Sequence, residues 1–403
     1  MFRTAFVVTL VLCLASCRGS FERNSQPFAA SGCRPIACSS LLPGPQPDDP
    51  TVNDCAYRAR NQWWLDYVAG SLAWRTQPGA RPVIVAVFDD GADTGHVDLR
   101  NQLWSNAREA SGTPGVDDDG NGFVDDVHGW DFVDEDPIVA PQGECLGRPQ
   151  HGTFMASLIA AERNNRRGIA GAGADGARVM IMRVAGCGRD PRDRADPARL
   201  VRALQYATRM GARILSFSAH WNDTTAQLDA AFAEIADRPD SPHAALVVAS
   251  VPNKGEPTAG YPAAYPFRRI IRAIPIGDED TISPGVSPVA PGLNFGAPSA
   301  CVVGATSGPD RFGVSHGSSN STAILAGLLA GIWSSPDYVM STPEEFVTQV
   351  IEGRMHHTKR RSRPGSRPPF LEGVALADAC LLEKSERAAR VCAEGAAVAI
   401  MIL

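Results

Sequence analysis

The chain has 403 residues, of which 44% are hydrophobic and 20% charged, and its formal net charge is −6. This composition is ordinary for a globular protein, and the length is ample for one large α/β domain. The negative net charge argues against a nucleic-acid partner. The basic run Lys359-Arg360-Arg361-Ser362-Arg363 lies between Pro and Gly residues, so we interpret it as a solvated loop rather than a binding patch.

The first 17 residues have the pattern of an export signal. Arg3 supplies a positive charge, and the apolar run from Ala5 to Ala15 has 11 residues, against the roughly 20 of a membrane-spanning helix. The segment ends in Leu14-Ala15-Ser16-Cys17, which resembles the bacterial lipobox, whose cysteine becomes the lipidated first residue. We therefore expect an extracytoplasmic protein anchored to a bacterial membrane through Cys17; ordinary cleavage and secretion is the alternative.

Residues 18–53 are rich in Ser, Pro, Gly and Asp without periodicity, and this composition predicts a flexible tether. Removal of Cys13 and lipidation of Cys17 would leave eight cysteines. An even number in an oxidising compartment predicts disulfides. The candidate pairs are Cys33–Cys38, Cys145–Cys187 and Cys380–Cys392, and the sequence leaves the connectivity open.

Strands and helices alternate along the rest of the chain. Apolar runs predict buried strands at 83–89, 179–184, 213–218, 245–250 and 269–276. Helices are predicted at 151–163, 197–210, 224–237, 319–333 and 343–352. The alternation predicts an α/β fold with a mainly parallel central sheet flanked by helices on both faces. We place this domain at residues 54–380 and treat 381–403 as a C-terminal extension.

Three residues at the ends of these elements are candidates for nucleophilic catalysis. Asp89 ends the strand at 83–89, and the carboxyl edge of a parallel sheet is where α/β proteins place their sites. His151 and Ser319 each open a helix, whose first N–H groups can help to hold an oxyanion. A hydroxyl nucleophile needs a base, and the base needs an orienting acid, so we predict Ser319, His151 and Asp89 in these roles. Any one of them alone also fits a helix cap or strand end.

The chain resembles the subtilase family of serine peptidases over about residues 54–380, and Asp, His, Ser is the family's chain order. The matching segments are Val85-Ala86-Val87-Phe88-Asp89-Asp90-Gly91 with His96-Val97-Asp98-Leu99, His151-Gly152-Thr153-Phe154-Met155-Ala156, Leu246-Val247-Val248-Ala249-Ser250-Val251-Pro252-Asn253-Lys254-Gly255, Gly260-Tyr261-Pro262-Ala263-Ala264-Tyr265-Pro266 and Gly317-Ser318-Ser319-Asn320-Ser321-Thr322-Ala323. The resemblance implies a subtilisin-like three-layer fold and the hydrolysis of peptide bonds.

The resemblance also implies roles for further residues. Asn253 would complete the oxyanion hole with the backbone N–H of Ser319. His220, Trp221 and Pro252 depart from the family pattern beside the primary specificity pocket, and they would narrow it or mark reduced activity. Substrate contacts are implied for Asp90, Ser218, Ala219, His220, Ser250 and Gly260.

Asp90 stands where most bacterial members have Thr or Ser. The Asp-Asp-Gly run resembles the kexin branch of the family. There, the second Asp faces the substrate residue two positions before the cut and favours a basic side chain. The alternative for Asp90 is a hydrogen-bonded surface acid.

The run Asp117-Asp118-Asp119-Gly120-Asn121-Gly122-Phe123-Val124-Asp125-Asp126 has the spacing of a calcium loop. Oxygen ligands fall at the first, third, fifth and ninth positions, and a backbone carbonyl falls at the seventh. The predicted ligands are Asp117, Asp119, Asn121, the Phe123 carbonyl and Asp125. The twelfth position is His128 rather than the usual Glu, and a solvated acidic turn is the alternative. We expect structural Ca²⁺ and no organic cofactor.

The sequence as a whole predicts a monomeric, exported serine endopeptidase that acts on peptide or protein substrates. One alternative is a catalytically weak or inactive protein of the same fold that binds peptides, which the altered pocket residues favour. The other alternative is an esterase on the same scaffold. Reaction with a fluorophosphonate and a comparison of ester with peptide substrates would separate the three.

Overall fold

The computed structural model describes residues 28–29, 51–59, 61–68, 74, 81–140, 142, 150–186, 196–253, 260–276, 292–352 and 375–376. Its centre is an eight-stranded sheet in which every neighbouring pair is parallel. In spatial order the strands are β11 (Ala375–Leu376), β8 (Leu293–Pro298), β7 (Ile270–Ile276), β6 (Leu246–Ser250), β5 (Ile214–Phe217), β2 (Val83–Asp89), β4 (Ala177–Arg183) and β3 (Gly129–Asp131).

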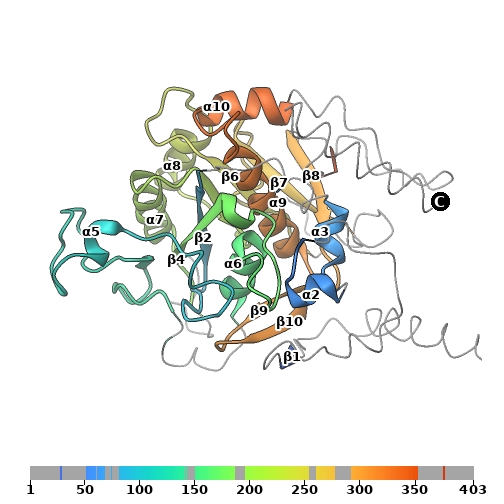
Figure 1. Ribbon diagram of the computed structural model, residues 1–403. Helices are drawn as coiled ribbons and strands as arrows, with labels where there is room; N and C mark the ends of the chain where they lie inside the picture. Colours follow the sequence, from blue (N-terminus) through green and yellow to red (C-terminus); the bar gives the residue numbers. More distant parts are fainter. Residues whose placement is uncertain are drawn as a thin grey trace, which may run out of the picture.

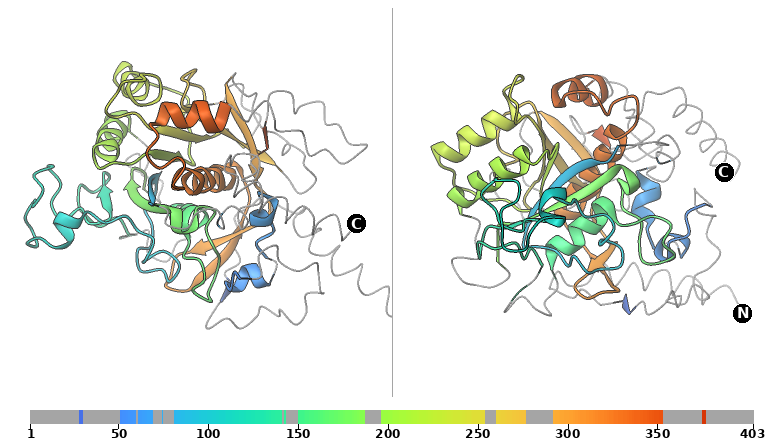
Figure 2. Two further views of the ribbon diagram at one scale, coloured as in Figure 1. Left: turned by 45° about the horizontal axis from the view of Figure 1, so that its top comes forward. Right: turned by 60° about the vertical axis from the view of Figure 1, so that its left-hand side comes forward.

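Helices cover both faces of this sheet (Figures 1 and 2). One face packs on α6 (His151–Ala160) and α9 (Ser318–Trp333), and the other packs on α7 (Pro197–Arg209) and α8 (Ala226–Ala236). Strand β2 supplies both cores, because Val85 and Val87 face α6 and α9 while Ala86 and Phe88 face α7 and α8. A parallel strand buried on both faces accounts for the continuous apolar run in its sequence. The predicted α/β fold in three layers is confirmed.

The central helix is α9, in which every residue except Ser319 is buried. It contains no charged residue, so it can lie inside the molecule without unpaired charge. By contrast, α7 is amphipathic: Leu200, Ala203, Leu204 and Ala207 face the core. Its N-terminus is capped by Asp196, whose carboxylate accepts from Arg199 N–H at 2.9 Å.

A smaller antiparallel sheet joins β1 (Phe28–Ala29), β10 (Arg311–Ser315) and β9 (Val302–Thr306). Strand β1 belongs to the segment 18–53 that we predicted as a flexible tether, so at least this part of it pairs with the domain. The other described helices are short: α2 (Cys55–Arg58), α3 (Trp63–Tyr67), α5 (Ala107–Ala110), the 3-10 turn η3 (Ala174–Gly176) and α10 (Pro343–Phe346), which continues into a π-helical segment, Val347–Glu352.

The predicted strands and helices agree with the structure to within a few residues. The helix predicted at 343–352 is divided into α10 and the π-helical segment. Sequence reasoning missed β3, β8, β9 and β10. Strand β3 is too short for a period to show, while Gly296 and Pro298 interrupt the apolar pattern of β8. The β9–β10 hairpin had a recognisable Ser307-Gly308-Pro309-Asp310 turn, which we did not interpret.

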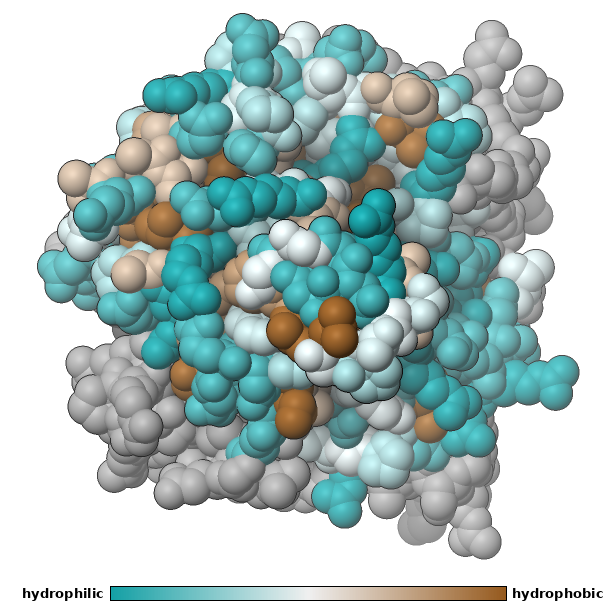
Figure 3. Space-filling model, turned by 90° about the vertical axis from the view of Figure 1, so that its left-hand side faces the viewer, coloured by the Kyte–Doolittle hydropathy of each residue, from teal (hydrophilic) through white to brown (hydrophobic). Residues whose placement is uncertain are grey.

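An arm formed by residues 106–127 projects from the domain and includes α5 (Figure 1). Its base is closed by a hydrogen bond from Asn106 N–H to the Val127 carbonyl, 2.9 Å long. Figure 3 looks onto the side that carries the arm, and there the brown apolar residues are scattered among hydrophilic ones. Val116 and Val124 are the arm's exposed large apolar side chains. Within the described residues, no helix combines the length and apolar character needed to cross a membrane.

Candidate active site

Asp89 is the last residue of β2, at the carboxyl edge of the sheet and between β4 and β5. Its side chain is buried, and its two carboxylate oxygens lie 2.9 and 2.8 Å from Nδ1 of His151. His151 opens α6, so its ring projects from the helix start while the rest of the helix packs in the core. An ionised carboxylate at this distance fixes the proton on Nδ1 and leaves Nε2 as the basic nitrogen.

The imidazole of His151 is 42% exposed. Burial alone would lower its pKa, but the charge and hydrogen bond of Asp89, together with the charge of Asp90, raise the pKa of His151 to about 9. The two acidic neighbours therefore favour the imidazolium, which is the form that a general base takes on after it has accepted a proton.

Ser319 is the second residue of α9, and the turn before it requires Gly317, whose φ is +131°. The Ser319 hydroxyl donates to the Ser218 carbonyl at 2.9 Å, and the Ser218 hydroxyl donates back to the Ser319 carbonyl at 3.2 Å. These two bonds tie the start of α9 to the end of β5. No hydrogen bond joins the Ser319 hydroxyl to His151 within the described part of the chain. If Ser319 is the nucleophile, as the sequence predicts, its hydroxyl must turn from Ser218 toward His151 before it reacts.

Asn253 lies beside the same turn, three residues after the end of β6. Its Oδ1 accepts from the Ser318 N–H at 2.8 Å. A Cβ at position 317 would stand only 3.3 Å from the amide of Asn253, so Gly317 lets that amide approach the nucleophile's turn. Because Oδ1 is held by Ser318, Nδ2 is the end of the amide that can donate to an oxyanion.

Asp90 has contacts that the sequence did not predict. Its Oδ1 accepts from Gly152 N–H at 2.7 Å, and its Oδ2 accepts from His151 N–H at 3.2 Å. The carboxylate is thus directed at the start of α6. Burial and the neighbouring Asp89 charge raise the pKa of Asp90 to about 7, although His151 and the two N–H groups oppose that shift.

The other predicted substrate-binding residues lie at the ends of β5 and β6. Ser218, Ala219 and His220 follow β5 directly, and the buried Ser250 ends β6. His220 packs on Gly260, because a Cβ at position 260 would stand 3.1 Å from the His220 Cβ and Cδ2. Trp221 and Tyr261 exchange backbone hydrogen bonds of 3.1 and 2.8 Å. The bulky side chain of His220 therefore faces the small residue Gly260, and the predicted narrowing of a specificity pocket stays a prediction.

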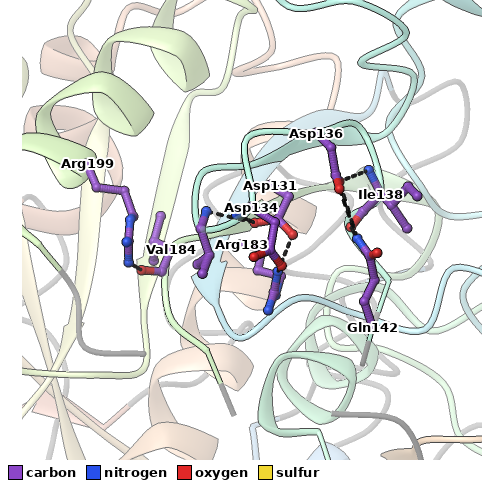
Figure 4. A network of polar contacts seen from close by, with 9 residues as sticks. Asp131, Asp134, Asp136, Ile138, Gln142, Arg183, Val184 and Arg199 are labelled. Carbon is purple, nitrogen blue, oxygen red and sulfur yellow. Dashed lines mark hydrogen bonds and ion pairs between the residues drawn. The ribbon is translucent and has the colours of Figure 1, made fainter. Parts of the chain in front are cut away.

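An ion-pair network around the buried Arg183 stands beside β2 (Figure 4). Arg183 ends β4 in register with Asp89, and its guanidinium pairs with Asp131 and with Asp134, the latter at 2.5 Å. Beyond it, the Gln142 side-chain amide donates to the Asp136 carboxylate and to the Ile138 carbonyl at 3.2–3.3 Å. These contacts hold the segment that leaves β3 against the edge of the sheet that carries Asp89.

The predicted calcium ligands are arranged differently from an EF-hand loop. Asp117 accepts from the N–H groups of Gly120, Asn121 and Gly122, and Asp125 accepts from Gly115. The Phe123 ring contacts Trp130, Phe132 and Tyr206, so Phe123 anchors the arm to the domain. Among the predicted ligands, only Asp119 joins the arm's carboxylate cluster.

That cluster consists of Glu109, Asp119 and Asp126, which offer oxygens within 4.8 Å of one another. The side-chain amides of Asn106 and Asn121 each donate to both Asp119 and Asp126, at 2.7–3.1 Å. Burial raises the pKa of Asp126. Closely spaced carboxylate oxygens are the donors that calcium prefers, so this set fits the ion by its chemistry. The sequence analysis did not assign Glu109 or Asp126 as ligands, although Asp126 lies within the acidic run that it singled out.

Cys55 and Cys301 each take part in a disulfide bond. Three of our predictions lie outside the described residues: the three cysteine pairs, lipidation at Cys17 and the C-terminal extension 381–403.

Comparisons with known proteins identify the family and the fold of the chain. A model of the subtilase family matches residues 80–374, so the chain belongs to the subtilase family. The solved structure of fervidolysin from Fervidobacterium pennivorans, a keratinolytic enzyme related to subtilisin, has the same fold, with a TM-score of 0.59 and 18% identity over 82% of this chain and 46% of that chain.

The similar proteins of known activity match parts of the chain. Subtilisin-like protease 1 of Plasmodium vivax is 42% identical over 87 residues, 22% of this chain and 13% of that protein. The thermophilic serine proteinase of Bacillus sp. (strain AK1) is 25% identical over 280 residues, 70% of this chain and 59% of that protein. Thermitase of Thermoactinomyces vulgaris is 27% identical over 215 residues, which cover 53% of this chain and 62% of thermitase. The chain therefore spans less than two thirds of each of these relatives.

Proposed function

We propose that the protein is a serine endopeptidase that uses Ser319, His151 and Asp89. The observation that carries this proposal is the pair of 2.8 and 2.9 Å contacts between His151 and Asp89, at the sheet edge where α6 begins. Family membership supports it, because the chain carries the family's Asp, His and Ser motifs in order.

In this proposal His151 Nε2 takes the proton from the Ser319 hydroxyl as its oxygen attacks the peptide carbonyl. Asp89 holds the ring and stabilises the imidazolium that forms. The negative charge on the carbonyl oxygen is received by the Asn253 Nδ2 group and the Ser319 backbone N–H. His151 then returns the proton to the leaving amine, and water hydrolyses the acyl-enzyme by the same route in reverse.

The test is active-site labelling of the full chain with a fluorophosphonate, followed by hydrolysis of a peptide library. Ser319→Ala should abolish labelling and lose on the order of 10⁶ in kcat, as loss of the nucleophile does in subtilisin. Ser318→Ala is the matched control, since alanine keeps the N–H that holds Asn253, and it should still be labelled. Labelling of Ser319→Ala would show that the assigned nucleophile is wrong.

The alternative function is peptide binding by a weak or inactive member of the family. Two contacts favour it: the Ser319 hydroxyl donates to Ser218, and His220 packs on Gly260. Unlabelled wild-type protein that still retains peptides would support this alternative. Labelling together with hydrolysis of esters but not of peptides would instead indicate an esterase.

We also propose that Ca²⁺ binds the arm and stabilises the fold, with Glu109, Asp119 and Asp126 as its carboxylate ligands. The support is the close approach of these three oxygen donors. This set shares only Asp119 with the loop predicted from the sequence. Asp117 belongs to the predicted loop alone and Asp126 to the structural set alone, so these two residues can distinguish the sets.

Attachment of the protein to a bacterial membrane through Cys17 is a further proposal, supported by Leu14-Ala15-Ser16-Cys17. Mass spectrometry of the mature N-terminus should find an acylated Cys17, and Cys17→Ser should release the protein from the membrane fraction. A mature N-terminus that begins at another residue would rule this out.

A further inference from the structure

The two neighbouring acids at the end of β2 contact different parts of the same residue. Asp89 meets the side chain of His151, whereas Asp90 meets its backbone: the Asp90 carboxylate accepts the first two N–H groups of α6, at 3.2 Å from His151 and 2.7 Å from Gly152. We infer that Asp90 is a positioning residue of the proposed hydrolysis, which fixes the backbone of His151 beside Asp89 and adds a second negative charge next to the imidazolium. The inference rests on the proposed function.

The start of α6 needs a partner from outside the helix. The first N–H groups of a helix have no partner within it, and the residue before the helix usually caps them. Gln150 occupies that place, but its side chain makes no cap hydrogen bond, and the first turn of α6 contains no acid. Asp90 supplies both the hydrogen-bond acceptor and the negative charge that a helix N-terminus favours.

The packing leaves the helix start little room to move. A Cβ on Gly152 would stand 2.1 Å from the Gly91 carbonyl oxygen and 3.0 Å from the Asp89 Cβ. The Asp90 N–H also donates to Asp89 Oδ1 at 2.9 Å. The turn Asp89-Asp90-Gly91 therefore packs tightly against the first turn of α6. A substitution at Asp90 would for this reason alter the position of His151 directly.

The charge of Asp90 acts on the imidazole as well as on the backbone. Burial has the largest effect on the pKa of His151 and lowers it, and Asp89 has the next largest effect and raises it. The charge of Asp90 adds a smaller effect that also raises this pKa. The other charged groups on the packed elements are engaged elsewhere: Arg183 on β4 pairs with Asp131 and Asp134, and Asp93 accepts from Gly95 and Gly308. Within the described part of the chain, Asp89 and Asp90 are thus the acids that act directly on His151.

The experiment is a titration of His151 by NMR in the full chain carrying carbon-13-labelled histidine, with His151→Gln to assign its signal. Asp90→Asn removes the charge but keeps an oxygen that can accept from Gly152, so it should lower the His151 midpoint by about one pH unit. Asp93→Asn is the matched control, because Asp93 is a carboxylate of the same turn that also accepts two backbone N–H groups. It should leave the midpoint unchanged. An unchanged midpoint in Asp90→Asn would overturn the inference.

Kinetics supply the second measurement. With Asp90→Asn, the acidic limb of kcat/KM should move to lower pH by the same amount as the NMR midpoint. Asp90→Ala, which removes both acceptors, should lower kcat roughly 10- to 100-fold and leave KM unchanged. A rise in KM confined to peptides with a basic residue two positions before the cut would show that Asp90 contacts substrate instead.

The two proposals fail in different ways. A wild-type protein that neither labels nor cleaves peptides would contradict the proposed function, while the NMR midpoint would still test Asp90. An active enzyme with equal midpoints in wild type and Asp90→Asn would contradict only the role of Asp90.

Discussion

At the scale of single residues, the proposed oxyanion hole depends on the orientation of the Asn253 side-chain amide. Oδ1 of Asn253 accepts from Ser318 N–H at 2.8 Å, so the backbone before the nucleophile orients the side chain. Nδ2 is then directed away from Ser318 and remains the donor end of the amide. The orientation of Asn253 thus depends on the same turn that presents Ser319, and the two groups are placed together.

We expect Asn253→Leu to lower kcat about 10²- to 10³-fold with little change in KM, because the lost hydrogen bond forms only as charge develops on the carbonyl oxygen. Steady-state hydrolysis of a peptide identified from the library would measure both constants. A raised KM with an unchanged kcat would mean that Asn253 binds the substrate in its ground state instead.

At the scale of elements, the site is built where the starts of two helices meet the carboxyl edge of one sheet. Helix α6 brings His151 to the end of β2, and α9 brings Ser319 to the end of β5. Glycine at the start of each helix permits this approach, Gly152 in α6 and Gly317 before α9. At Gly152 the close fit between helix and turn therefore takes precedence over local helix propensity, whereas Gly317 stands before its helix, where a φ of +131° favours glycine.

The substitution Gly152→Ala tests whether packing against the turn outweighs helix propensity at this position. Alanine is about 1 kcal/mol better than glycine inside a helix, so propensity alone predicts stabilisation. The new Cβ would stand 2.1 Å from the Gly91 carbonyl oxygen, so we expect a net loss of about 1–3 kcal/mol in the free energy of unfolding, with slower fluorophosphonate labelling.

Urea unfolding would measure the stability change. Gly95→Ala is the control on the same turn, since its Cβ would meet only the Asp93 carboxylate at an ordinary 3.4 Å. Equal changes in the free energy of unfolding for the two substitutions would show that close packing of α6 on the turn does not cause the loss.

At the scale of the whole molecule, the arm is a projecting segment that holds a cluster of acidic side chains. Its cluster brings Glu109, Asp119 and Asp126 together, and the amides of Asn106 and Asn121 compensate only part of their mutual repulsion. Phe123 connects the arm to α7 by packing on Tyr206, whose hydroxyl donates to Asp126 at 2.6 Å. A cation bound in the arm would therefore stabilise the contact between the arm and the domain.

Calcium should raise Tm, because a ligand that binds only the folded state adds about 2.7 kcal/mol of stability at 100 times its Kd. Differential scanning calorimetry with calcium and with chelator would measure the shift. Asp119→Ala should remove most of it, whereas Asp118→Ala, a change on the same loop outside both ligand sets, should keep it. Loss of the shift in Asp117→Ala but not in Asp126→Ala would favour the loop predicted from the sequence.

The sequence by itself determined the fold class, the order of the main elements and the segments that carry Asp89, His151 and Ser319. These depend on local patterns: β2 is a continuous apolar run because it is buried on both faces, and each motif stands at an element end. Only the tertiary structure decided what depends on approach between distant segments. The Asp90 carboxylate accepts hydrogen bonds from the backbone of α6, and the Ser319 hydroxyl donates one to the Ser218 carbonyl. Asp119 lies in a carboxylate cluster with Glu109 and Asp126. Local patterns say nothing of these contacts, because packing of whole elements sets where a side chain finds its partner.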